Sequence, residues 1–193
     1  VEQTFSQEEL QEYIKCMNDP AYFAKKYIKI INLDRGLVPF DLYPYQGNMF
    51  DHFNNNRFSI VLACRQSGKS ISSVVYILWY AIFKPEQTIA VLANKGATAQ
   101  EMLGRVTLAL ENLPFFLQPG CKTLNKKSIE FSNNSRIVAA ATPGNSIRGM
   151  SVNLLFLDEF AFAENDGTFY TSTYPVITSG KTTRVIKIGR AHV

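Results

Sequence analysis

The segment that most limits how this chain can fold is a glycine-containing loop at residues 64–70, with the sequence Cys-Arg-Gln-Ser-Gly-Lys-Ser. A continuous apolar run, residues 58–63, precedes this glycine loop, and residues 70–83 follow it with apolar side chains at helical spacing. A strand, a loop and a helix are therefore expected in direct succession. The continuous apolar character of the first segment predicts a strand buried on both faces of a parallel sheet.

The glycine loop contains the residue types that bind a phosphate chain. Gly68 lets the backbone approach phosphate, Lys69 can reach the terminal phosphates of a nucleotide, and Ser70 can ligate Mg²⁺ at a helix N-terminus. Ala63 stands at the first glycine position of the usual G-x-x-x-x-G-K-[ST] pattern, so the specificity comes from the flanking strand and helix. The candidate nucleotide-binding residues here are Cys64, Arg65, Gln66, Ser67, Gly68, Lys69 and Ser70.

The rest of the chain alternates short apolar runs with helical patterns, which is typical of an α/β fold. Further strands are predicted at residues 87–92, 153–157 and 183–188, and a helix at residues 97–112. Residues 128–131 and 136–141 flank a polar turn and could form a hairpin or two adjacent strands. Near the N-terminus, Ser6 and Glu9 predict a capping box for a helix that extends through Cys16, and Asp19 and Pro20 predict the start of another short helix.

Composition sets outer limits on the protein class. The 193 residues, 46% of them hydrophobic, suffice for one domain with a full core. The net charge of +4 permits an anionic partner such as nucleic acid without identifying one. Cys16, Cys64 and Cys121 are widely separated and odd in number, which supports neither a disulfide framework nor a zinc site. No apolar stretch has the ~18 residues of a membrane span, and no secretory signal pattern opens the chain, so we expect a soluble cytosolic protein.

An acidic pair, Asp158 and Glu159, follows the most apolar strand candidate, at the edge where open α/β sheets bind ligands. Beside a phosphate-binding loop, the aspartate holds the magnesium shell and the glutamate orients or deprotonates the attacking water. The alternative is an acidic pair that caps the following segment. Capping does not explain the pairing with a glycine loop, so we favour a site that binds and hydrolyses ATP.

Two arginines compete for the role of neutralising charge on the γ-phosphate. Arg65 lies inside the glycine loop and would act within its own subunit. Arg148, in the glycine-flanked segment 144–149, could instead reach the nucleotide of a neighbouring subunit, or could be a surface arginine paired with a carboxylate. Gln46 has an amide that can both donate to and accept from the edge of adenine, although a loop glutamine is the alternative.

These segments together resemble the ATPase domain of the large terminase subunit of tailed bacteriophages, especially its T4-like branch. The resemblance covers nearly the whole chain and rests on residues 42–46, 64–70, 146–149 and 154–162. A phosphate loop that contains arginine and lacks the first glycine is itself typical of terminases. The resemblance implies a RecA-like P-loop ATPase fold of the ASCE type, with a largely parallel central sheet flanked by helices.

The resemblance also implies a role for each matching residue, with ATP and Mg²⁺ as cofactors. Gln46 would lie at adenine, and Ser70 and Asp158 at magnesium. Arg65 and Arg148 match the two arginine-finger positions of the family. The catalytic residues implied are Glu159, Arg65, Arg148 and Lys69.

In the family, this domain powers the translocation of double-stranded DNA through a portal ring into an empty capsid. The implied partners are double-stranded DNA, the portal protein, the small terminase subunit and further copies of the chain in a ring. The implied location is the host cytoplasm, with a transient stay on the procapsid and none in the mature virion.

Residues 188–193, Ile-Gly-Arg-Ala-His-Val, resemble the in-frame translation of a sequencing-library adapter, and we interpret them as a non-native tail of a longer protein. An ordinary polar C-terminal tail is the alternative. The family's coupling motif is expected near residues 184–186, and its RNase H-like nuclease domain after that. We therefore expect one ATPase domain, with an N-terminal segment at 1–56 and a core at 57–187, that binds ATP, hydrolyses it slowly and does not cut DNA.

Two other functions fit part of the pattern. A superfamily 2 helicase shares the glutamine, loop and acidic motifs, but its acidic pair continues as Asp-Glu-x-His or Asp-Glu-x-Asp, whereas residues 160–162 here are Phe-Ala-Phe. A non-catalytic nucleotide-binding scaffold is the second alternative. Glu159 argues against a scaffold, because a pure switch needs no positioned water.

Overall fold

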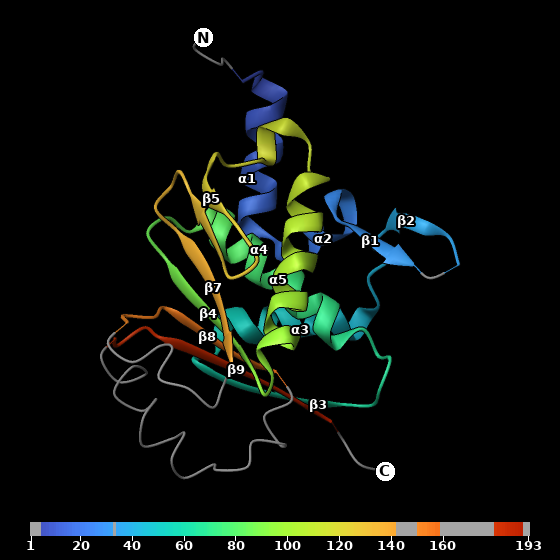
Figure 1. Ribbon diagram of the computed structural model, residues 1–193. Helices are drawn as coiled ribbons and strands as arrows, with labels where there is room; N and C mark the ends of the chain where they lie inside the picture. Colours follow the sequence, from blue (N-terminus) through green and yellow to red (C-terminus); the bar gives the residue numbers. More distant parts are fainter. Residues whose placement is uncertain (1–4, 33, 142–149, 159–179, 191–193) are drawn as a thin grey trace.

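A largely parallel seven-stranded sheet organises the chain in the computed structural model, which describes residues 5–32, 34–141, 150–158 and 180–190 (Figure 1). The helices are α1 (Gln7–Asn18), α2 (Pro20–Tyr27), α3 (Pro44–Asn55), α4 (Lys69–Phe83), α5 (Gly96–Glu111) and the short 3-10 helix η1 (Phe115–Leu117). The strands are β1 (Lys29–Asn32), β2 (Gly36–Pro39), β3 (Phe58–Ala63), β4 (Thr88–Ala93), β5 (Cys121–Leu124), β6 (Ser128–Phe131), β7 (Arg136–Ala141), β8 (Leu154–Asp158) and β9 (Arg184–Arg190). The predicted α/β class is confirmed.

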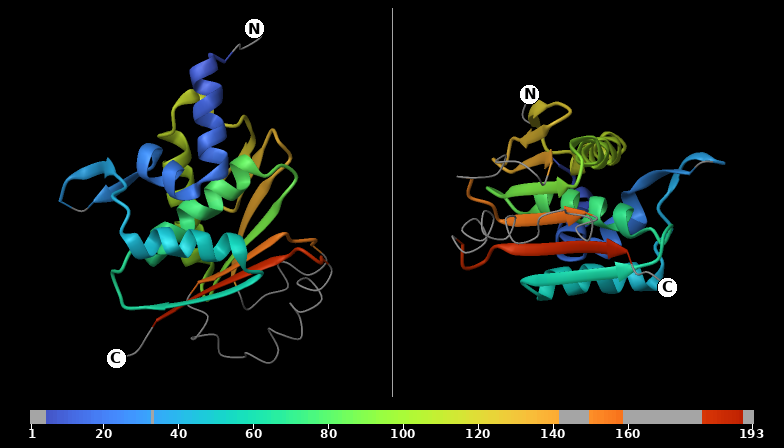
Figure 2. Two further views of the ribbon diagram at one scale, coloured as in Figure 1. Left: turned by 180° about the vertical axis from the view of Figure 1, so that it is seen from behind. Right: turned by 60° about the horizontal axis from the view of Figure 1, so that its bottom comes forward.

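The strand order of the large sheet is β3-β9-β8-β4-β7-β6-β5. The strands from β3 to β7 in this order are parallel, and β6 and β5 continue the sheet in antiparallel fashion. Figure 2 shows the arrowheads of the parallel strands at one edge. The two strands at 128–131 and 136–141, for which sequence left two arrangements open, form a hairpin, and the backbone N–H of Phe131 donates to the carbonyl oxygen of Ser135 (2.9 Å).

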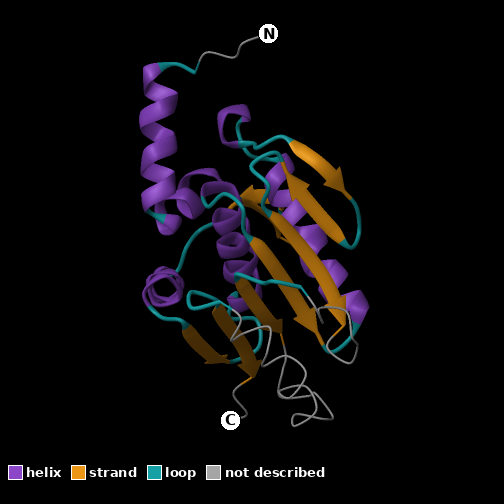
Figure 3. Ribbon diagram, turned by 90° about the vertical axis from the view of Figure 1, so that its left-hand side faces the viewer, coloured by secondary structure: helices purple, strands orange, loops and turns teal. Residues whose placement is uncertain are grey.

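Helix α4 forms the centre of the core. Every residue from Ser72 to Phe83 is buried, because the sheet lies on one side of the helix and other helices cover the rest (Figure 3). The indole nitrogen of Trp79 donates to the carbonyl oxygen of Cys16 at 2.8 Å, which joins α4 to α1. The helix is apolar on all sides because it has no solvent-facing side.

The two N-terminal helices begin where their sequences predict. In α1, the Ser6 hydroxyl accepts from the Glu9 N–H (3.1 Å) and the Glu9 carboxylate accepts from the Ser6 N–H (2.9 Å), so the capping box is confirmed. In α2, the Asp19 carboxylate accepts from two backbone N–H groups, and Pro20 occupies the first turn.

One carboxylate, that of Glu12, ties α1 to α2. It accepts hydrogen bonds from Lys26 (2.6 Å) and Lys15 (2.9 Å), and from the hydroxyls of Tyr27 (2.8 Å) and Tyr22 (2.9 Å). The bond from Lys26, followed by those from Lys15 and the two tyrosines, holds the pKa of Glu12 far below its usual value. The same bond raises the pKa of Lys26.

The expectation that residues 58–63 are buried on both faces is wrong. Strand β3 is the edge strand of the sheet, and Phe58, Ile60 and Leu62 are 58%, 67% and 65% exposed. Their register with β9 puts them on the same face as Val185, which belongs to a second apolar cluster separate from the main core. The apolar pattern of β3 is correct for a parallel strand, but burial also depends on the position of the strand in the sheet.

Three short strands, β1, β2 and β5, were not predicted. Strands β1 and β2 form a two-stranded hairpin that projects from the body of the protein in Figures 1 and 2. Strand β9 runs to Arg190 and so includes part of the segment interpreted as a non-native tail, and its Ile188 is fully buried. Within the described ranges, no helix has the length and apolar character to cross a membrane.

Candidate functional site

The candidate site lies at the edge of the sheet where the parallel strands end. The register pairs Asp158 with Ile188, and Ile188 with Val61, so Asp158 lies at the level of a residue just before the glycine loop. Strand β9 separates β3 from β8, which sets their backbones about 10 Å apart. The sheet therefore places the glycine loop and the first acidic residue at one edge, as the sequence predicts.

Gly68 lies in the glycine loop directly before α4 and is the N-cap of this helix. Its φ of +78° lies in the left-handed region, which glycine adopts without steric cost. A Cβ at this position would lie 2.5 Å from the side-chain nitrogen of Gln46. The glycine is thus required both by the backbone turn and by the close approach of α3.

Lys69 turns its ammonium group back into the glycine loop. The side-chain nitrogen donates to the carbonyl oxygen of Cys64 at 2.9 Å, and the residue is only 8% exposed. The hydroxyl of Ser67 donates to the same carbonyl oxygen at 3.0 Å. These bonds hold the loop closed around the ammonium group of Lys69. A phosphate oxygen is a stronger acceptor for this ammonium group than a carbonyl oxygen is.

Ser70 differs from the other serines around it. Ser67, Ser72 and Ser73 each donate to a backbone carbonyl, at 3.0, 3.0 and 2.9 Å. The Ser70 hydroxyl makes no hydrogen bond to any part of the chain that the structure describes. This half-buried hydroxyl, in the first turn of α4, is therefore available to ligate a cation or to form a hydrogen bond.

The donor set at the sheet edge fits Mg²⁺ with a phosphate ligand. Asp158 is 7% exposed at the end of β8 and supplies a hard carboxylate oxygen, and Ser70 supplies a hydroxyl. No group of three or more His, Cys, Asp or Glu among the described residues could hold a metal by itself. Mg²⁺ is usually held by one or two carboxylates together with substrate phosphates, and this sparse set is of that kind.

Gln46 is buried rather than open to a ligand. It is 1% exposed, its amide oxygen accepts from the Tyr43 N–H at 2.8 Å, and its amide nitrogen donates to the Gly68 carbonyl oxygen at 3.4 Å. The first of these bonds is the return half of a capping box at the start of α3. In this arrangement Gln46 braces the glycine loop, and its contact with adenine stays a prediction.

Two exposed tyrosines lie beside Gln46 in the sequence, and one of them, Tyr45, is hydrogen-bonded to Ser67 of the glycine loop. The rings of Tyr43 and Tyr45 stack with centroids 6.0 Å apart and an interplanar angle of 11°, and both are exposed. Burial of its hydroxyl raises the pKa of Tyr45, while a hydrogen bond with Ser67 opposes that shift.

Of the predicted arginines, only Arg65 can be placed, and it is exposed in the glycine loop. Arg148 and Glu159 lie outside the described residues. A third arginine, Arg105 of α5, was missed. It lines a pocket of about 300 Å³ together with residues 66–71.

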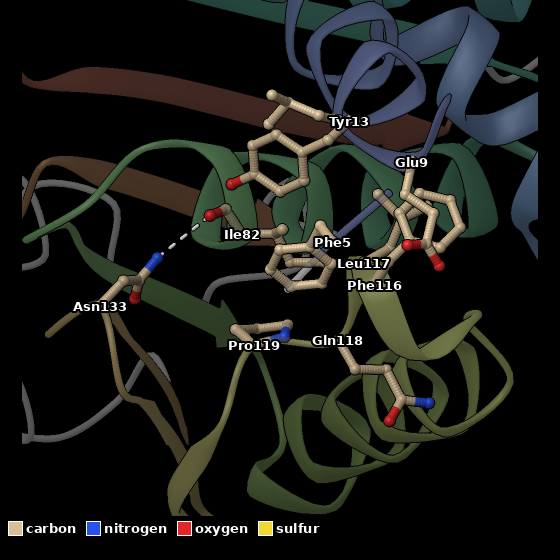
Figure 4. A pocket seen from close by; sticks show the side chains of 10 residues that line it. Phe5, Glu9, Tyr13, Ile82, Phe116, Leu117, Gln118, Pro119 and Asn133 are labelled. Carbon is tan, nitrogen blue, oxygen red and sulfur yellow. Dashed lines mark hydrogen bonds between the residues drawn. The ribbon is translucent and has the colours of Figure 1, made fainter. Parts of the chain in front are cut away.

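A second pocket, of about 290 Å³, lies at the opposite end of α4 (Figure 4). Mostly apolar side chains line it, among them Phe5, Tyr13, Ile82 and Pro119. The side-chain nitrogen of Asn133 at its rim is bonded to the carbonyl oxygens of Ala81 and Ile82. The residues that line this pocket include no lysine or arginine, so it does not resemble a site for an anionic ligand.

Comparison with known proteins gives a family match. The family described as "Terminase large subunit, T4likevirus-type, N-terminal" matches residues 60–188, which is more than half of this chain. The match spans the glycine loop, both acidic residues and most of the sheet.

Solved structures share the fold at low sequence identity. The large terminase of bacteriophage HK97 superposes with a TM-score of 0.73 and 17% identity over 90% of this chain. The large terminase ATPase domain of Thermus phage P74-26 gives 0.65 and 16% over 78%. The large terminase of another thermophilic bacteriophage, solved in complex with ADP, gives 0.60 and 13% over 77%. The chain spans 37%, 65% and 39% of the lengths of these three proteins, respectively. Their similarity to this chain confirms the predicted RecA-like fold.

Proposed function

The chain belongs to the terminase large subunit family, in its T4-like N-terminal region, and from this we propose that it binds Mg-ATP at the glycine loop and hydrolyses it. The hydrolysis powers translocation of double-stranded DNA into a procapsid. The chain is one ATPase domain, with an N-terminal segment at residues 1–56 and a core at 57–187.

The observation that carries the proposal is the state of three adjacent residues. Gly68 is in a left-handed conformation, Lys69 has its ammonium group inside the loop, and the Ser70 hydroxyl makes no bond within the described residues at the N-terminus of α4. A helix N-terminus favours negative charge because its first N–H groups are unpaired. A phosphate chain satisfies the lysine and the N–H groups together, which no group in the described part of the chain does.

Each residue then has a distinct task. Lys69 exchanges the Cys64 carbonyl oxygen for phosphate oxygens, and Ser70 and Asp158 are the residues that would hold Mg²⁺. When bound, Mg²⁺ would supply positive charge beside the phosphates, where negative charge develops as the terminal phosphoryl group is transferred to water. Glu159, next in sequence after Asp158, orients the attacking water and accepts its proton.

The partners belong to the same proposal. We assign double-stranded DNA, the portal protein, the small terminase subunit and further copies of the chain in a ring on the portal as partners. The host cytoplasm is the proposed location. The basic balance of the chain, +4, is compatible with a DNA partner.

Phosphate release and nucleotide binding, measured separately, test the proposal. Lys69→Ala abolishes binding of ATP, whereas Glu159→Gln retains binding and loses turnover by about a hundredfold or more. Unchanged turnover in Glu159→Gln removes the catalytic assignment. An unmodified chain that binds ATP but releases no phosphate, even with double-stranded DNA and portal present, favours a scaffold over a motor.

A further inference from the structure

Arg105 on α5 is a charged residue at the glycine-loop pocket to which the proposed function gives no role. We propose that Arg105 is a third phosphate-binding cation of the site and that it exchanges its ion pair with Glu101 for the phosphates of the bound nucleotide. The inference rests on the proposed nucleotide site and adds to it a ligand-binding residue on a second helix.

The fold brings α5 to the pocket. Helix α5 follows β4, whose C-terminal end pairs with Asp158 at the same sheet edge as the glycine loop. The helix packs beside α4, as Figure 1 shows. Arg105 consequently lines the pocket of about 300 Å³ with Ser70 and Ile71, although it is far from them in sequence.

Packing does not account for an arginine at this position. The buried face of α5 is made by residues such as Met102, Leu103 and Val106, whereas the Arg105 side chain is 46% exposed. Its hydrogen-bond partner among the described residues is the Glu101 carboxylate, at 2.6 Å, which is itself 65% exposed. An exposed pair of this kind contributes little to stability, so the fold loses little when the pair opens.

The guanidinium is suited to a phosphate chain. It has five N–H donors in a planar fork, and only one of them is used by Glu101 in the described structure. A phosphate offers two acceptor oxygens at the spacing of that fork, which makes a bidentate contact stronger than the contact with a lone carboxylate oxygen. Glu101 holds the side chain beside the pocket until phosphate replaces it.

The test compares three variants of the 193-residue chain, with ATP and inorganic tripolyphosphate as probes in titration calorimetry. Arg105→Gln lowers the affinity for both probes by about tenfold, because a charge-assisted contact is lost. Arg105→Lys keeps the charge without the fork and is intermediate. Glu101→Gln raises both affinities about twofold, because the competing carboxylate is gone.

The matched control is Lys15→Gln, which also removes one cation from an intrahelical ion pair (2.9 Å) but lies on α1. It leaves both affinities unchanged. The dependence of affinity on ionic strength distinguishes a phosphate contact from a purely structural role of Arg105. In Arg105→Gln the affinity for tripolyphosphate should depend less steeply on ionic strength than in the unmodified chain, and loss of packing alone does not give this change.

The outcomes distinguish this inference from the proposed function. If the unmodified chain binds neither ATP nor tripolyphosphate, the nucleotide site itself is wrong. If the unmodified chain binds both and Arg105→Gln binds them equally well, only the assignment of Arg105 is overturned. A loss in Glu101→Gln as large as that in Arg105→Gln also overturns it, because the pair would then act by supporting α5.

Discussion

Gln46 closes the space beside Gly68: its amide nitrogen lies 3.4 Å from the glycine carbonyl oxygen and would be 2.5 Å from a Cβ on that glycine. Helix α3 and the N-terminus of α4 therefore meet at a point with no room for a side chain. Because the same residue pair borders the glycine loop, the geometry of the loop depends on a contact between two segments that precede and follow β3.

The first prediction concerns Gly68→Ala. The new methyl group must displace Gln46, and the left-handed φ adds a cost of roughly 1–2 kcal/mol, so the variant loses ATP affinity by more than about tenfold. Gly36→Ala is the matched control, since Gly36 also has a positive φ (+68°) but no atom within 4 Å of its added Cβ. Thermal unfolding temperatures should fall in both variants, whereas ATP binding should fall only in Gly68→Ala. Loss of ATP binding in both would contradict the steric argument.

A second prediction separates two roles of Gln46. If it braces the glycine loop, as its burial indicates, Gln46→Ala weakens binding of ATP and also of tripolyphosphate, which has no base to recognise. We expect about a tenfold loss for tripolyphosphate, because the change leaves the Tyr43 N–H without its side-chain acceptor and removes the amide contact with Gly68. Competitive titration with a fluorescent ATP analogue measures both. Loss confined to ATP would instead assign Gln46 to adenine alone.

The third prediction is that the stability of the fold depends on pH through the carboxylate of Glu12. Its folded-state pKa is depressed below the usual 4.5, first by the bond from Lys26, so its ionised form stabilises the fold at pH values above 4.5. That stabilisation declines as the pH falls below 4.5 towards the folded-state pKa. Glu12→Gln is therefore less stable than the unmodified chain at neutral pH, and the difference shrinks in acid.

Thermal unfolding of the two chains, followed from neutral pH to well below 4.5, measures that difference. Gln11→Ala, on an exposed part of the same helix, is the control, because neither side chain titrates and its difference from the unmodified chain should not change with pH. A gap between Glu12→Gln and the unmodified chain that stays constant with pH would contradict the assignment.

The sequence predicts the local elements well because their signals are local. The strand at 58–63 has the predicted bounds, and the helix after it begins at Lys69, one residue before its predicted start. The C-cap of this helix, Lys84, comes directly before Pro85, which cannot continue a helix. For residues 128–141, the sequence did not decide between a hairpin and two adjacent strands, because strand pairing depends on neighbours in the sheet as well as on the turn.

The features that sequence misses are those that depend on distant segments. Strands β1, β2 and β5 have only four residues each, too few for a periodic pattern to stand out, whereas the equally short β6 was marked by the polar turn that follows it. The exposure of Ile60 follows from the edge position of β3, which no pattern within the strand reports. Arg105 belongs to the pocket only because α5 packs beside α4, and nothing in the sequence around it marks a phosphate contact.

The last prediction concerns whether each of the two proposed arginine fingers acts on the nucleotide of its own subunit or of a neighbouring subunit. We expect Arg65, which lies in the glycine loop itself, to act within its own subunit, and Arg148 to act on the nucleotide of a neighbour. Each Ala variant alone should lose turnover by roughly a thousandfold, the typical contribution of such an arginine. Mixing each variant with Lys69→Ala, which keeps both arginines but cannot bind ATP, separates the two roles when phosphate release is measured on a portal ring.

In the mixed ring, the Lys69→Ala subunit supplies Arg148 to its Arg148→Ala neighbour, and phosphate release rises above that of either chain alone. The mixture with Arg65→Ala stays inactive, because the missing arginine and the intact nucleotide site are in the same chain. Rescue of Arg65→Ala would contradict its action within its own subunit. Failure to rescue Arg148→Ala, in rings confirmed to contain both chains, would contradict its action on a neighbour.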